Sequence, residues 1–323
     1  MKDASPRSLS YRLTTALLSF TREVFCRIPE PAAIFLGERT GDLLRILLSG
    51  KRRILRENLS LSDLALTGRT EERRFEKRVF RHFGRLGAEF LRLPKLSDQE
   101  ISERVRVDGL ERLRAELAKG RGVLLLTGHI GNWEIALRRL SIEAPGRFHP
   151  LIRRIESPAV NDFVDRHRRE FGKGASILAD LGPKPLIRAL RAGDVLIVLL
   201  DQNAGQGEGV FTPFLGRPAA TYTSLARLSL LTNLPVFPSV CHRKPDGRFQ
   251  IRILAPIPPE PDLATEEAVS RMTFRYSQEL SAFVHEHPEQ WIWMHRRWKT
   301  RPPEELPRQT EKSGSLVGPD PAP

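Results

Sequence analysis

Two hydrophobic patterns divide the chain. Up to about residue 100, apolar residues recur every three or four positions among charged ones, which predicts amphipathic helices over Leu9 to Ile28 and Glu71 to Leu93. Beyond residue 105, short continuous apolar runs bounded by glycine, proline and polar residues alternate with helical patterns. Such runs predict buried strands, because a half-exposed strand would alternate apolar and polar residues.

This alternation predicts the fold class. Strands are expected from residue 105, at 123–126, 150–154, 194–200, 234–241 and 249–254, with helices at 111–118, from 132, and at 161–170, 224–231 and 265–286. Strands that alternate with helices favour an α/β fold, a mostly parallel sheet flanked by helices. We expect this domain over residues 105–302, after a helical, membrane-associating region over 1–104. Residues 303–323 are rich in Pro, Glu and Ser and are expected to be disordered.

One stretch, Gly122 to Ala136, joins an expected strand to residues suited to catalysis. His129 follows the apolar run in a strand-to-helix turn, where open α/β folds bind ligands. Asn132 is expected to cap the next helix, and Glu134 lies in its first turn. A neutral histidine can act as a general base, and a carboxylate can fix its tautomer. His129 could equally brace the turn, and one His with one Glu does not decide between the two.

Charge and composition narrow the possible partners. The formal net charge of +13 favours anions, namely nucleic acid, anionic lipid or an acidic protein. The chain has no zinc-finger, homeodomain or RNA-binding motif, so no nucleic-acid partner is expected. Two cysteines without a Cys/His ligand set indicate no metal site, and we expect no cofactor.

The start of the chain has features of a membrane-surface protein. No run reaches the ~18 uncharged apolar residues of a spanning helix, and no signal peptide is evident. The stripe from Leu9 to Ile28 and the stretch from Pro31 to Leu48 are apolar, and four cations follow between Lys51 and Arg56. Together they predict peripheral or monotopic attachment to an anionic membrane on its cytoplasmic side. A helix packed on its own domain explains the stripe equally well.

Four motifs carry a resemblance to a known family. The segment Gly-His-Ile-Gly-Asn-Trp-Glu around His129 resembles the first motif of the lysophospholipid acyltransferase superfamily, in the version found in the late acyltransferases of lipid A biosynthesis. Three more segments resemble that family and stand in its order: Arg53 to Leu59, the loop from Asp201 to Thr221, and the ending Pro288 to Pro302. The resemblance covers about residues 52 to 302.

The resemblance implies transfer of a fatty acyl group from acyl carrier protein, or from acyl-CoA, to a hydroxyl of a lipid A precursor. It places the protein on the cytoplasmic face of a bacterial inner membrane and implies catalysis by His129 and Glu134. The residues expected to bind substrate are Asn132, Arg153, Arg168, Asp201, Arg296 and Arg297. Arg166 is the alternative to Arg168 for the same arginine of the family motif.

Two alternative functions remain open on the sequence. The chain could acylate another membrane lipid, such as a lysophospholipid or a phosphatidylinositol mannoside, because the motifs do not fix the acceptor. It could also be a non-catalytic protein that binds anionic membranes. A serine hydrolase is not favoured, because the chain lacks a Gly-x-Ser-x-Gly elbow.

Overall fold

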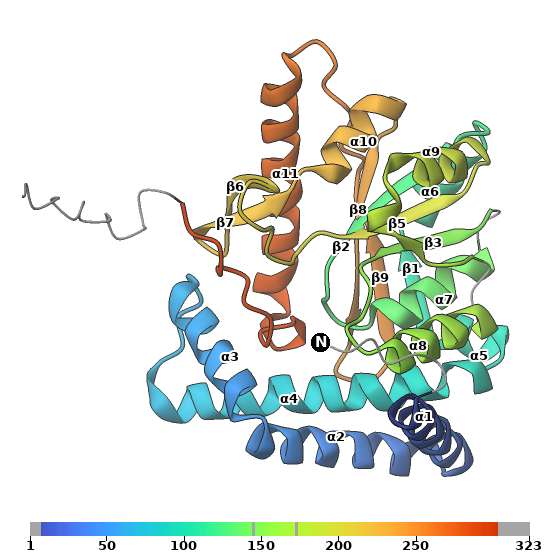
Figure 1. The fold of residues 1–323 in the computed structure, drawn as a ribbon, viewed down its shortest axis with the longest axis vertical. Coiled ribbons are helices and arrows are strands. Elements are labelled where there is room, and N and C mark those ends of the chain that lie inside the picture. Colours follow the sequence, from blue (N-terminus) through green and yellow to red (C-terminus); the bar gives the residue numbers. More distant parts are fainter. Residues whose placement is uncertain (1–7, 144–145, 172–173, 303–323) are drawn as a thin grey trace, which may run out of the picture.

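The computed structural model describes residues 8–143, 146–171 and 174–302. A seven-stranded sheet crosses the molecule in the order β1-β9-β8-β2-β5-β3-β4 (Figure 1). All neighbouring pairs are parallel except β8 with β9, which confirms the expected α/β class and the mostly parallel sheet. The seven strands are β1 (Val105–Asp108), β2 (Val123–Thr127), β3 (Phe148–Ile152), β4 (Ile177–Leu178), β5 (Val195–Leu199), β8 (Val236–Arg243) and β9 (Phe249–Ile253).

Helices cover both faces of this sheet and form the region before it. The α-helices are α1 (Leu9–Arg27), α2 (Glu30–Leu47), α3 (Ser49–Leu61), α4 (Gly68–Arg92), α5 (Asp98–Arg104), α6 (Leu110–Leu117), α7 (Trp133–Glu143), α8 (Pro158–Phe171), α9 (Pro183–Arg191), α10 (Ser224–Thr232) and α11 (Thr265–Glu286). Short 3₁₀ segments lie at η1 (Leu93–Lys95), η2 (Ala179–Leu181) and η3 (Pro288–Gln290). The tail expected over 303–323 lies outside the described residues.

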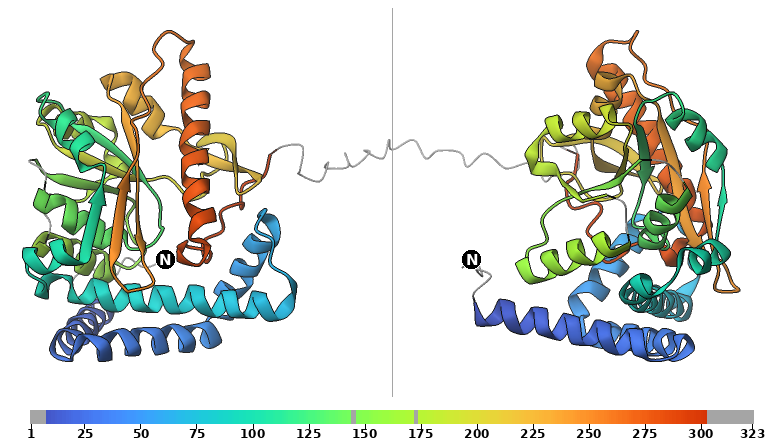
Figure 2. Two further views of the ribbon diagram at one scale, coloured as in Figure 1. Left: turned by 180° about the vertical axis from the view of Figure 1, so that it is seen from behind. Right: turned by 90° about the vertical axis from the view of Figure 1, so that its right-hand side faces the viewer.

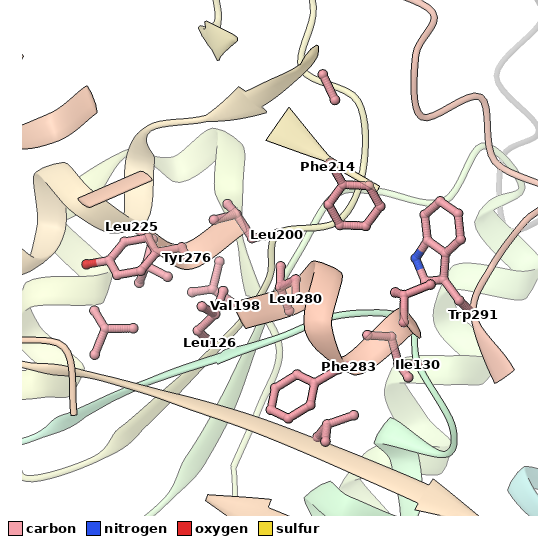
Figure 3. Close-up of a cluster of buried hydrophobic side chains, with 14 of the residues drawn as sticks. Leu126, Ile130, Val198, Leu200, Phe214, Leu225, Tyr276, Leu280, Phe283 and Trp291 are labelled. Atoms are coloured by element: carbon pink, nitrogen blue, oxygen red, sulfur yellow. The ribbon is translucent and has the colours of Figure 1, made fainter. Parts of the chain in front are cut away.

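The continuous apolar run of β2 is explained by burial on both faces. Leu124 and Leu126 join a hydrophobic cluster with residues of α9, α10 and α11. Val123 and Leu125 join a second cluster, with residues of α5, α6 and α7 on the other face. Both faces of the strand are therefore buried, and a polar side chain on either face would have no contact with solvent. Figure 3 shows part of the first cluster, where Leu126 lies among side chains from β5, α10 and α11.

The helical region packs closely on itself and on the sheet domain. α2 runs beside α4, and a Cβ atom on Gly84 would lie 2.1 Å from the carbonyl oxygen of Gly37. Leu55 and Phe75 from this region belong to the first sheet cluster. The domain boundary at residue 104 stays a prediction. No helix among the described residues is long and apolar enough to cross a membrane.

Part of α1 turns an apolar stripe away from the protein. Leu13, Leu17 and Phe20 are 62%, 65% and 68% exposed. The opposite side of α1 contacts α8, where the Tyr11 hydroxyl donates to Asp162 at 2.9 Å. α1 and α2 lie along one end of the molecule (Figures 1 and 2).

A second, two-stranded sheet was not predicted as strands. β6 (Gly209–Phe214) and β7 (Arg217–Tyr222) form an antiparallel hairpin where the sequence indicated a loop and a turn. The connection is two residues long, and Leu215 and Gly216 both have positive φ, 47° and 76°. Two-residue turns of this kind match the twist of paired strands, so the segment continues as a hairpin.

Candidate active site

The turn after β2 is fixed from several sides. Gly131 has φ +62°, and a Cβ there would lie 1.8 Å from the carbonyl oxygen of Cys241, so only glycine fits. The side chain of Asn132 accepts a hydrogen bond from the Ile135 N–H at 2.9 Å and caps α7, as the sequence indicated. Its amide donates to Glu89 at 2.9 Å, which links the turn to α4. His129 is thereby held at the carboxyl end of the central strand.

A buried carboxylate holds the imidazole of His129. Asp201 follows β5 and is 0% exposed. Its Oδ1 lies 2.8 Å from Nδ1 of His129, and its Oδ2 accepts from the His129 backbone N–H at 2.7 Å. The Trp291 indole donates to the same Oδ2 at 2.9 Å. One carboxylate therefore fixes both the ring and the backbone of His129.

The charge state of this pair follows from its contacts. Burial acts to raise the pKa of Asp201, but the charge and hydrogen bonds of His129, with the Trp291 indole, outweigh burial and hold that pKa below its ordinary value. An ionised Asp201 can only accept a hydrogen bond, so Nδ1 of His129 carries the proton that it donates to Asp201. The other ring nitrogen, Nε2, is then the basic one in the neutral imidazole.

Glu134 occupies a different position from the one expected. Both Nε and Nη2 of Arg168 donate to its carboxylate, with Nε at 3.0 Å, and the Trp133 indole donates to it at 3.0 Å. The expectation that Glu134 orients His129 is corrected, because Asp201 makes that contact. Glu134 instead fixes Arg168, which is largely buried. Trp133 also packs edge-on against His129, with ring centroids 5.0 Å apart.

A pocket of about 780 Å³ opens beside His129. His129, Glu134 and Arg168 contribute polar groups to its wall. Most of the remaining lining is apolar and comes from β3, β5, α9 and α10, including Leu151, Leu186, Ile197, Leu199, Leu228 and Leu231. Three exposed arginines also line it: Arg153, Arg154 and Arg227. This shape accommodates an apolar chain next to the His129 imidazole.

Comparison with known proteins assigns the chain to a family. A profile of the bacterial lipid A biosynthesis acyltransferases matches residues 2–300. The chain belongs to this family. The lipid A biosynthesis lauroyltransferase of Escherichia coli K12 is 28% identical over 85% of this chain and 88% of its own. The palmitoleoyltransferase of the same strain is 24% identical over 86% and 89%, and the myristoyltransferase is 28% identical over 64% and 63%.

Two of the arginines expected at the family's binding site line the pocket. Arg168 does so from α8, whereas Arg166 is exposed and its Nε donates to the backbone of Asp162 at 3.3 Å. The pocket lining therefore favours Arg168 over Arg166 as the arginine of the family motif. Arg153 leaves β3, lies over the Tyr222 ring at 4.4 Å and approaches Glu208 at 3.8 Å.

Four other expected binding residues are not among the residues that line the pocket. Asp201 is 0% exposed and binds His129. Asn132 is 0% exposed and is used by the turn. Arg296 is exposed and does not line the pocket. Arg297 is 0% exposed and donates to the carbonyls of Gln202 and Ala220 and to the Thr221 hydroxyl. Burial lowers the pKa of Arg297 to about 10, and it remains a cation at neutral pH.

The three tryptophans of the family's C-terminal motif belong to the protein core. Trp291, Trp293 and Trp298 are at most 2% exposed and pack in the first sheet cluster. Asn58 of α3 donates to the backbone carbonyls of Trp293 and His295, so the Arg53–Leu59 motif holds the C-terminal one. The role of Trp291 could not be read from the sequence, because it lies 90 residues from Asp201.

Proposed function

We propose that this protein transfers a fatty acyl group from acyl carrier protein to a hydroxyl of a lipid A precursor. The observation that carries the proposal is the His129 imidazole, held through Nδ1 by the buried Asp201 and lining a largely apolar pocket. A non-catalytic membrane protein would have no use for such an open site. The family and the named activities of its relatives support the acceptor class.

The reaction needs a base and no protein nucleophile. Nε2 of His129 takes the proton of the acceptor hydroxyl while that oxygen attacks the thioester carbonyl. A C–O bond forms, and the tetrahedral intermediate then collapses with cleavage of the C–S bond. The imidazolium returns the proton to the departing sulfur. Asp201 stabilises the imidazolium between these steps and holds the ring in the productive tautomer.

The two substrates divide the pocket by polarity. The apolar wall between α9 and α10 takes the acyl chain, which leaves water as it enters. Arg153 and Arg168 face phosphate groups of the acceptor or the oxyanion that develops during attack, because guanidinium groups bind both. Glu134 keeps Arg168 in the pocket wall and prevents the buried cation from standing unpaired.

The acceptor lipid cannot dissolve freely, so the protein must work at a membrane. The exposed apolar stripe on α1, together with the apolar residues exposed on α2, is the surface that reaches the bilayer. The cations between Lys51 and Arg56 lie next to the end of α2 and attract anionic headgroups. We place the protein on the cytoplasmic face of a bacterial inner membrane.

Replacement of the base tests the proposal. His129→Ala should lower kcat for transfer from acyl carrier protein to a lipid A precursor by about 10²–10⁴-fold. His285→Ala, at an exposed histidine on α11, is the control and should keep wild-type turnover. Circular dichroism and thermal melting establish that both variants fold. A folded His129→Ala variant that turns over at more than a tenth of the wild-type rate would contradict the mechanism.

A further inference from the structure

Helix α9 carries a basic stripe. Its cations Lys184, Arg188 and Arg191 are all exposed, and spacings of four and three residues place them on one side of the helix. The other side, with Leu186, Ala189 and Leu190, is buried in the first sheet cluster. The sequence has no Asp or Glu between Asp180 and Asp194. The stripe therefore has no acidic neighbour along its own segment.

These cations also lack partners from other elements. Across the ranges that the structure describes, none of the three forms an ion pair, whereas Arg22, Arg81 and Arg243 each bind a carboxylate from a distant segment. Surface cations near one another and without counter-charges repel, so their grouping does not stabilise the fold. A partner with negative charge would relieve this repulsion.

The stripe begins at the edge of the pocket. Gly182 and Pro183, the residues directly before Lys184, line the pocket together with His129. Leu181, one residue earlier, is a 56% exposed apolar side chain. An apolar side chain beside exposed cations can exclude water from a contact that the charges guide. A partner seated on α9 would lie next to the pocket opening.

The position of α9 separates this surface from the membrane-facing one. In Figure 1, α9 lies in the upper half of the molecule, and α1 and α2 lie along its lower end. The large exposed apolar stripes belong to α1 and α2, with Leu13, Leu17 and Phe35 among them. A protein that rests on the bilayer through those helices presents α9 to the aqueous side.

We propose that the α9 stripe is the docking surface for the acidic carrier protein that delivers the acyl group. This rests on the donor named in the proposed function. The cations guide the carrier by charge complementarity, and Leu181 gives an apolar contact at the edge of the pocket. The thioester arm of the docked carrier then enters past Gly182 and Pro183. The membrane and the carrier thus meet the protein at separate surfaces.

Charge reversal combined with two donors tests the docking surface. The variant Lys184→Glu/Arg188→Glu/Arg191→Glu should raise KM for the acyl carrier donor at least about tenfold and flatten the salt dependence of kcat/KM. The rate with the corresponding acyl-pantetheine, a thioester without the carrier protein, should stay within about twofold. The glutamine triple variant should give a smaller rise in KM and serves if the glutamate variant does not fold.

A charge-matched control distinguishes local from overall charge. Arg69→Glu/Arg73→Glu/Lys77→Glu reverses three exposed cations of α4 with no ion pairs among the described residues, and should leave KM for the carrier near wild type. An unchanged carrier KM in the folded α9 variant would overturn the docking surface, as would an equal loss with both donors. Loss of flotation with phosphatidylglycerol vesicles would assign the stripe to the membrane instead. A wild-type protein inactive with the carrier but active with acyl-CoA would refute the donor itself.

Discussion

At the scale of single residues, Asp201 sets the orientation of the His129 imidazole. It is fully buried, it is ionised, and it accepts three hydrogen bonds, two from His129 and one from Trp291. Asp201→Asn removes the charge that stabilises the imidazolium and lets Nδ1 act as the acceptor. We expect kcat to fall by about 10²–10⁴-fold with little change in KM, as for other buried Asp–His pairs. Asp262→Asn, at an exposed position, is the control. Steady-state kinetics with near-wild-type kcat for Asp201→Asn would show that the carboxylate only supports the fold.

The sequence identified His129 and placed Asp201 at a strand end, but it gave the orienting role to Glu134. Glu134 is five residues from His129 and lies on the next turn, whereas Asp201 is 72 residues away. Sequence spacing favours the near carboxylate because it contains no information on how β2 and β5 align. Their register pairs Thr127 with Leu199 and so brings the two strand ends together. That pairing is a property of the tertiary structure.

A buried histidine makes the stability dependent on pH. His82 is 8% exposed and lies 3.2 Å from the Gly131 carbonyl; burial, with the charge of Arg243, lowers its pKa to about 3 from 6.5. The unfolded chain therefore binds a proton near pH 6.5 that the folded protein does not bind, and stability is lost as the pH falls toward 3. Between pH 7 and pH 5, His82→Gln should lose about 2 kcal/mol less unfolding free energy than wild type.

Urea unfolding at pH 7, 6 and 5 measures this difference. Glutamine keeps an N–H donor for the Gly131 carbonyl. The variant therefore removes the titrating group and retains the hydrogen bond to Gly131. His285→Gln, at an exposed histidine, should follow the wild-type pH profile. If His82→Gln loses as much stability as wild type between pH 7 and pH 5, His82 is not the group that binds the proton on unfolding.

At the scale of elements, η3 connects the C-terminal motif to the turn that carries His129. The Gln290 side chain accepts from the Arg243 N–H at 2.8 Å and donates to the Arg243 carbonyl at 3.0 Å, and its backbone carbonyl accepts from Gly131 at 2.9 Å. Gln290→Ala leaves two backbone groups of β8 without partners. We expect a loss of about 2–4 kcal/mol in unfolding free energy, and a lower kcat because the turn carrying His129 loosens.

The neighbouring residue offers a matched comparison. Glu289→Ala removes a partly exposed side chain one position earlier and should change the unfolding free energy by less than about 0.5 kcal/mol. Denaturant unfolding and steady-state kinetics on both variants give the answer. If both variants are equally stable, the contacts of Gln290 do not hold the turn.

Elements with strong periodicity were predicted, and shorter ones were not. The run at Val123–Leu126 and the stripe of α4 were clear because each repeats a single pattern over its length. Helix α5 has only seven residues, and its capping box of Ser97 and Glu100 lies in a charged segment without a clear stripe. β4 has two residues, too few to show any period. Such elements exist because neighbours pair with them or cover them.

At the scale of the whole molecule, the structure changes how membrane attachment should be tested. Deleting α1 and α2 would uncover α4 and α8, because Gly37 packs on Gly84 and Tyr11 binds Asp162. Substituting the exposed stripe leaves those contacts intact. Leu13→Gln/Leu17→Gln/Phe20→Gln should lower the fraction that floats with phosphatidylglycerol vesicles at least about tenfold, because each side chain contributes roughly 1.5–3 kcal/mol on burial in the bilayer. Phe274→Gln and Leu231→Gln, exposed apolar residues of α11 and α10, are the controls and should float as wild type does. A triple variant that floats normally at low salt would place the membrane contact elsewhere on the protein.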